Sequence, residues 1–108
     1  DRFGDGPAGA AGRATVASID GTPEVRIDAR GLRPSAPGTR YEVWMIRDAR
    51  RMVSLGTFTD GRDGRAVVTL PVTADPRRYP VMDVSIEPAD GNPAHSGHSV
   101  LRSPGTPA

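Results

Sequence analysis

The sequence predicts an all-β fold: an antiparallel β-sandwich of about seven short strands, Ig-like in arrangement and without significant helix. Apolar stretches of strand length recur along the chain, and turn signals separate them. The 13 glycines and 11 prolines among 108 residues suit short strands joined by turns. No segment sustains apolar residues at the helical spacing i, i+3, i+4 and i+7. A small β-barrel is the second possibility.

The length corresponds to one domain, which the sequence divides into three parts. Residues 1–13 are rich in glycine and alanine and predict a flexible stalk or linker. Residues 14–102 form the predicted β-sandwich domain, and residues 103–108 form a frayed tail. The predicted strands cover residues 14–19, 24–29, 41–46, 52–59, 65–70, 81–87 and 98–102.

Alternation of apolar and polar residues assigns faces to several of these strands. In residues 24–29 every second residue is charged, which is typical of a half-buried strand after the Asp20-Gly21 turn signal. In residues 81–87 the pattern places Asp83 and Ser85 outward. In residues 52–59 it places Val53 and Leu55 on one face and Met52 and Phe58 on the other. Gly56 within that strand predicts a β-bulge or a close backbone approach.

Residues 41–46, Tyr-Glu-Val-Trp-Met-Ile, hold the only tryptophan and the densest apolar run of the chain. We expect a central strand that is buried on both faces, and a cost of about 3–5 kcal/mol for Trp44→Ala. The predicted structural core comprises Tyr41, Trp44, Ile46, Leu55, Phe58, Val84 and Ile86.

The composition argues against several classes of function. A net charge of +1 is too small to indicate a nucleic-acid-binding surface. The basic pairs Arg50-Arg51 and Arg77-Arg78 are expected to be ordinary solvent-exposed residues. The absence of cysteine excludes disulfides, thiolate metal sites and a cysteine nucleophile. No apolar run reaches the ~18 residues of a transmembrane helix.

Chemically active residues are few, and we expect no catalytic residue, no cofactor and no enzymatic activity. His95 and His98 are weak candidates for a metal site, because two imidazoles three residues apart can share an ion but do not hold it alone. Ser96 and Ser99 lie beside them without a nucleophile-elbow pattern. The Asp-Gly units at residues 60–64 predict a hairpin turn that supplies positive φ.

An ordered series of short motifs resembles the extracytoplasmic C-terminal domain of the anti-sigma-K factor family. The series is GLRPSAPGTRYEVWMI, then VSLGTFTDGRDGRAVVTLP, then VSIEPADGNPAHSGHSVL. The resemblance covers roughly residues 15–101. The matching positions are Gly31, Leu32, Pro34, Tyr41, Trp44, Ile46, Ser54, Leu55, Gly56, Phe58, Gly64, Leu70, Pro71, Ser85, Glu87, Pro88, Gly91, Pro93 and Gly97.

The resemblance implies a regulatory domain on the extracytoplasmic, periplasmic side of a single-pass membrane protein. The implied partners are a sigma factor, held by an N-terminal cytoplasmic segment outside this chain, and two proteases, one of site-1 type and one intramembrane. The membrane is reached only through a transmembrane helix that also lies outside this chain, and no nucleic acid is bound. The alternative function is a cell-envelope binding module for glycan or protein, with Phe3 and Tyr79 as exposed aromatic residues.

Overall fold

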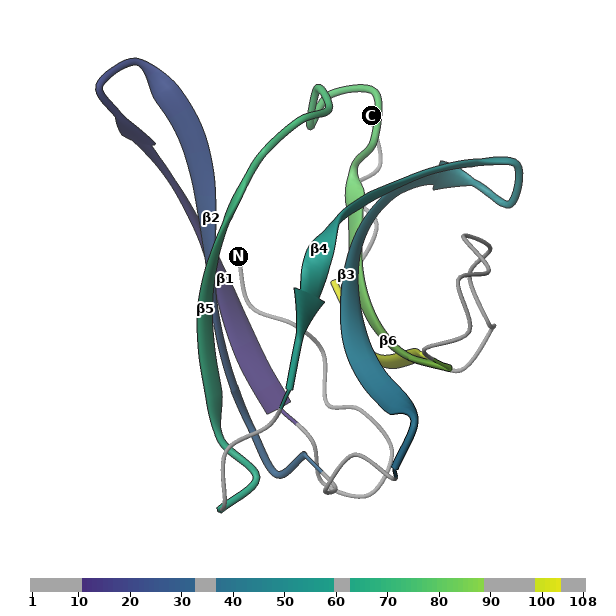
Figure 1. Cartoon of the computed structure of the whole chain (residues 1–108). Coiled ribbons are helices and arrows are strands. Elements are labelled where there is room, and N and C mark those ends of the chain that lie inside the picture. The colour runs from purple at the N-terminus through teal and green to yellow at the C-terminus, as the bar shows by residue number, and fades with distance from the viewer. Residues whose placement is uncertain (1–10, 33–36, 60–62, 89–98, 104–108) are drawn as a thin grey trace.

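The chain forms seven antiparallel β-strands, as predicted, in a computed structural model that describes residues 11–32, 37–59, 63–88 and 99–103 (Figure 1). No helix occurs within these ranges. The strands are β1 (Ala11–Ile19), β2 (Thr22–Arg30), β3 (Thr39–Asp48), β4 (Arg51–Phe58), β5 (Ala66–Pro71), β6 (Val81–Pro88) and β7 (Ser99–Arg102).

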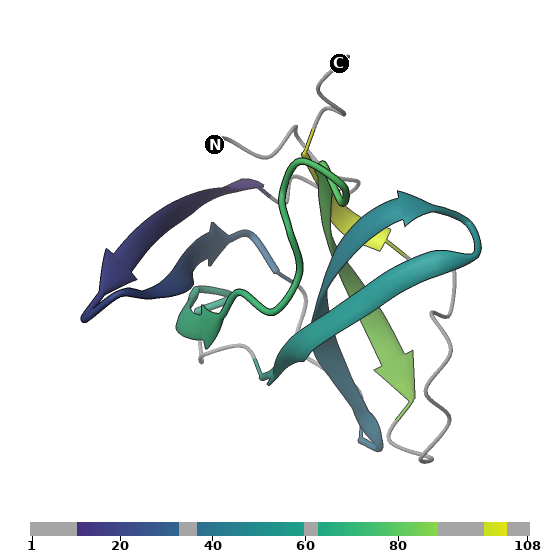
Figure 2. The same ribbon diagram turned by 90° about the horizontal axis from the view of Figure 1, so that it is seen from above.

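The strands form two sheets that pack face to face, which confirms the predicted sandwich (Figures 1 and 2). Sheet A has the order β1-β2-β5, and sheet B has the order β4-β3-β6-β7. This order is that of an Ig-like sandwich whose fourth strand pairs with the third. The connection from β5 to β6, over residues 72–80, crosses between the sheets as the sequence predicts.

The β1–β2 hairpin is closed by two residues of positive φ, Asp20 at 50° and Gly21 at 79°. Two such residues match the right-handed twist of the flanking strands, which explains the Asp-Gly sequence. β1 begins three residues earlier than predicted, because Ala11, Gly12 and Arg13 continue the ladder opposite residues 28–30 of β2. The other strands lie within two residues of their predicted bounds.

The hydrophobic core lies between the two sheets. Sheet A contributes small and branched residues, and sheet B contributes larger ones from its central strand β3. The buried members are Ala14, Val25, Ile27, Ala29, Leu32, Tyr41, Val43, Met45, Leu55, Ala66, Val84 and Leu101. The interior residues of β3 are thus flanked by β4 and β6 and covered by sheet A, which explains the apolar density of residues 41–46.

A β-bulge in β4 corrects one predicted face. Val43 pairs with Gly56 and Trp44 with Ser54, so Leu55 is an extra residue without a partner in the ladder. The extra residue breaks the period-2 alternation. Phe58 therefore packs against the core on the same side as Leu55, and its ring stacks on Tyr41 with centroids 5.4 Å apart.

Candidate functional site

The outer face of sheet A is lined by arginine side chains from all three segments that build this sheet. Because Val25, Ile27 and Ala29 of β2 face the core, the residues between them, Arg26 and Asp28, face away from sheet B. β1 obeys the same alternation, and its Arg13 pairs directly with Asp28. The sequence of β2 thus dictates an apolar inner face and a charged outer one.

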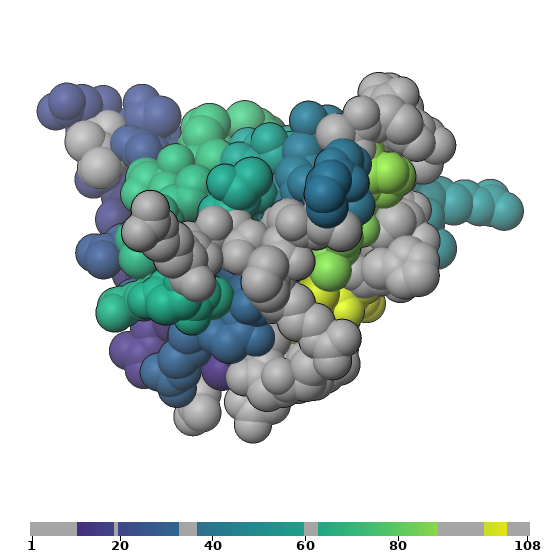
Figure 3. Space-filling view, turned by 60° about the horizontal axis from the view of Figure 1, so that its bottom comes forward, coloured from purple at the N-terminus to yellow at the C-terminus, as the bar shows by residue number. Residues whose placement is uncertain are grey.

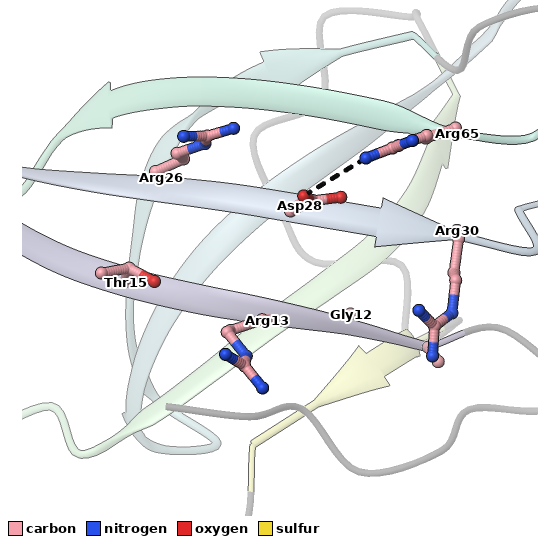
Figure 4. Close-up of a pocket in the computed structure, with 8 residues that line it drawn as sticks. Gly12, Arg13, Thr15, Arg26, Asp28, Arg30 and Arg65 are labelled. Carbon is pink, nitrogen blue, oxygen red and sulfur yellow. Dashed lines mark ion pairs between the residues drawn. The ribbon is translucent and has the colours of Figure 1, made fainter.

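Four arginines and one aspartate gather around a shallow depression on this face, with a volume of about 780 Å³. We call it the arginine depression; Figure 4 shows it at the start of β1 and the end of β2. Its lining residues are Ala11, Gly12, Arg13, Thr15, Arg26, Asp28, Arg30 and Arg65.

Positive charge predominates in the arginine depression. Its four arginines and single aspartate give +3, whereas the whole chain carries +1. Asp28 contacts one of the four, with 3.7 Å between its Oδ2 and Arg65 Nη2, and both side chains are substantially exposed. An exposed ion pair of this length stabilises the fold little. Within the described ranges, no hydrogen bond or ion pair joins Arg13, Arg26 or Arg30 to another side chain, so their guanidinium groups are available to an external anion.

The outer face of sheet B carries a cluster of hydrogen-bonded side chains that is buried, unlike the exposed arginine depression. Trp44 Nε1 donates a hydrogen bond to Ser85 Oγ at 2.9 Å, and Ser85 Oγ donates to Glu87 Oε2 at 2.5 Å. Ser85 is fully buried and Glu87 is 3% exposed. We call Trp44, Ser85 and Glu87 the buried relay. Each of its three side chains is hydrogen-bonded, so the relay has the character of a structural network.

A buried carboxylate extends this polar surface toward the edge of sheet B. Asp83 is fully buried and accepts hydrogen bonds from Ser99 Oγ at 2.6 Å and from Arg102 Nε at 2.8 Å. These contacts tie β7 to β6, which share three paired positions among the residues that the structure describes. Asp83 and Ser85 do face outward as predicted, but they are buried there.

The seven residues predicted as structural core divide between the two faces of sheet B. Five lie between the sheets: Tyr41, Leu55, Phe58, Val84 and Ile86. Trp44 and Ile46, 4% and 5% exposed, are buried outside that central cluster, on the face that carries the relay.

The metal candidates His95 and His98 lie outside the described residues, as does Phe3. Within the described ranges, no three His, Cys, Asp or Glu residues are grouped so as to hold a metal ion. Tyr79 is half-buried and packs against the core, so its ring is not presented as a glycan platform. The turn Asp63-Gly64 has the predicted positive φ, at 75° for Gly64.

Sequence reasoning missed the arginine depression. The arginine pairs that stand out in the sequence are Arg50-Arg51 and Arg77-Arg78. Both pairs are exposed; Arg51 is the first residue of β4, and the other three lie in turns. The arginines of the depression are separated by up to 52 positions in sequence, and strand register brings them together. The available signal was the alternation of residues 24–30, which places Arg26, Asp28 and Arg30 on one face.

Comparison with known proteins identifies the family. Residues 4–99 match the family model described as "Anti-sigma-K factor rskA, C-terminal". A search of curated proteins and a search of solved structures gave no match. The matched range includes β1 to β6 completely and reaches the first residue of β7, so it covers almost all of the sandwich. The chain therefore belongs to the anti-sigma-K factor family, as a C-terminal domain of that family.

Proposed function

We propose that the chain is the extracytoplasmic regulatory domain of a membrane-bound anti-sigma factor, which controls release of an extracytoplasmic-function sigma factor through regulated proteolysis. The observation that carries the proposal is the family match over residues 4–99. Membership in this family supports a regulatory role with a sigma factor as partner.

In this scheme an N-terminal cytoplasmic segment binds the sigma factor, and one transmembrane helix connects it to the sandwich. The part of the chain that the structure describes contains no helix long and apolar enough to cross a membrane. A site-1-type protease cuts the extracytoplasmic stalk, and an intramembrane protease then releases the sigma factor.

The fold limits where the first cut can occur. Residues 11–13 belong to β1 and pair with β2, so a protease reaches them only after local unfolding. We therefore place the cut before Ala11. A stress, ligand or partner regulates the cut by shifting the protein from a state in which the stalk is protected to one in which it is accessible. A ligand or partner can do so only if it binds the accessible state more tightly than the protected one.

The test measures proteolysis of the full-length protein in its membrane. We expect faster stalk cleavage and higher sigma-dependent transcription when the sandwich is deleted or is destabilised by Ser85→Ala. Arg47→Gln is the matched control, since Arg47 is exposed and its replacement leaves the core intact. Equal cleavage rates for the intact and the deleted sandwich would show that the domain does not shield the stalk.

A further inference from the structure

We propose that the arginine depression on sheet A is a docking site for the anionic headgroups of a lipid bilayer. This inference deepens the proposed function and rests on it, because the membrane is adjacent to the sandwich only if the protein is tethered. Nothing in the family match itself assigns a role to this face.

The positions of the arginines suit a surface with repeated phosphate groups. Arg26, Asp28 and Arg30 lie two residues apart along β2, and Arg13 pairs with Asp28 from β1. Diagonal neighbours on adjacent strands are about 7–8 Å apart, so Arg13 lies that far from both Arg26 and Arg30. Guanidinium groups bind phosphate oxygens through two parallel hydrogen bonds, which makes arginine well suited to this contact.

Apolar exposure accompanies the charge. The large hydrophobic residues exposed within the described ranges are Val16 and Val67, at 53% and 51%. Val16 pairs with the core residue Val25 and therefore lies on the other face of sheet A. Val67 pairs with Asp28, so it lies on the same outer face as the arginines. Cationic side chains beside an exposed aliphatic one match the interfacial region of an anionic bilayer, where phosphates lie above acyl chains.

The location also fits a tethered domain. The arginine depression includes Ala11, Gly12 and Arg13, the first residues of β1, so it lies where the sandwich begins. Among the described residues of β1, β2 and β5, the acidic side chains on this face are Asp28 within the depression and Glu24, which is half-buried and nearer the hairpin turn. Docking at this position holds the start of β1 against the bilayer and restricts access of a protease to the stalk.

The experiment is co-sedimentation of the 108-residue chain with vesicles at millimolar lipid. Vesicles of phosphatidylcholine alone are compared with vesicles of equal parts phosphatidylcholine and phosphatidylglycerol. We expect binding to the anionic vesicles at about 0.05 M salt, and its loss toward 1 M salt, where the Debye length falls to about 3 Å. Each arginine near an anionic surface contributes roughly a five-fold increase in partitioning.

Three variants separate the depression from the overall charge. The double variant R13Q/R26Q is expected to lower the partition coefficient about 25-fold. The control R47Q/R51Q changes the net charge equally on exposed positions of β3 and β4, whose turn lies across the molecule from sheet A (Figures 1 and 3). It is expected to bind like the wild type. Asp28→Asn removes the acidic group of the depression and is expected to increase partitioning about five-fold on anionic vesicles and not on neutral ones, whereas aggregation would raise sedimentation with both.

Several results would overturn the inference. They are equal binding to neutral and anionic vesicles, equal losses for R13Q/R26Q and R47Q/R51Q, and binding of soluble inorganic polyphosphate without binding to anionic vesicles. Failure of vesicle binding leaves the proposed function intact, because stalk cleavage in the full-length protein is measured independently. Conversely, vesicle binding with unregulated cleavage would refute the shielding function and not the lipid site.

Discussion

Ser85→Ala tests whether the hydrogen bonds of the buried relay stabilise the folded state more than exposed hydrogen bonds do. The substitution removes one hydroxyl and no carbon, so little volume is lost. It deletes the hydrogen bond from Trp44 Nε1 at 2.9 Å and the bond to the Glu87 carboxylate at 2.5 Å. A neutral hydrogen bond contributes about 1 kcal/mol net and one to a charged group about 1.5–3 kcal/mol. We therefore expect a loss of about 3 kcal/mol in the free energy of unfolding.

Ser54→Ala is the matched control within the same sheet. Ser54 Oγ also donates to a carboxylate at 2.5 Å, Oε2 of Glu42, but this pair is exposed to solvent. Water replaces an exposed hydrogen bond, so we expect a loss below about 1 kcal/mol. The two substitutions thus remove the same kind of bond in two environments.

Urea unfolding followed by the fluorescence of the single tryptophan, with circular dichroism as a second probe, measures both losses. The midpoint is expected to fall by about 1–3 M for Ser85→Ala with an unchanged slope, since m for a small domain is about 1–3 kcal/mol/M. In a Trp44→Phe background, which has no tryptophan and is followed by circular dichroism alone, the cost of Ser85→Ala is expected to fall by about 1 kcal/mol, because the shared bond is already absent. Equal losses for Ser85→Ala and Ser54→Ala would refute the role assigned to burial.

Two further predictions concern turns. Gly21→Ala, at φ +79° and in open space, is expected to cost only the backbone strain of about 1–2 kcal/mol. Gly64→Ala is expected to cost more than Gly21→Ala, because φ is +75° and an added Cβ would also lie 2.6 Å from the carbonyl oxygen of Leu32. Thermal melting compares the two, and equal costs would mean that the Leu32 contact is relieved. The hydrogen bond from the backbone N–H of Arg77 lowers the pKa of Asp75 below its ordinary value of 3.8. Because the pKa of Asp75 is lower in the folded state than in the unfolded state, ionised Asp75 stabilises the fold at neutral pH. This contribution to the free energy of unfolding is lost as the pH falls from 3.8 through the folded-state pKa. An NMR titration of the carboxyl group measures this, and a pKa at or above 3.8 would contradict the turn geometry.

Alternation of apolar and polar residues predicted the strands. The pairing register between strands decided which face some of their residues lie on, and alternation alone does not reveal that register. Period 2 is a local property, so the faces of residues 24–29 and 81–87 followed from neighbouring residues alone. The bulge at Leu55 depends on the pairing of β4 with β3, and for this reason Phe58 was assigned to the wrong face. A single extra residue in one strand reverses every later assignment in that strand.

The candidate sites were less predictable for the same reason. Arg13 and Asp28 meet only because β1 pairs with β2 in the observed register, and Arg65 joins them from the segment before β5. The burial of Asp83 could not be predicted from its polar position in β6, because outward alternation indicates a face and not its exposure. The hydrogen bonds from Ser99 and Arg102 show what makes a carboxylate tolerable there.

The assignment of β1 and β7 to different sheets determines how the domain bears mechanical load. A pull between the two ends of the sandwich is carried through both layers, because neither terminal strand is bonded to the other. Among the described residues, nine positions of β1 pair with β2, whereas three positions of β7 pair with β6. Force applied along the strands loads such a ladder in shear, and force across them opens it pair by pair. Under tension we therefore expect β7 to separate first, once the bond between Arg102 and Asp83 and the two bonds between Met82 and Ser103 have broken.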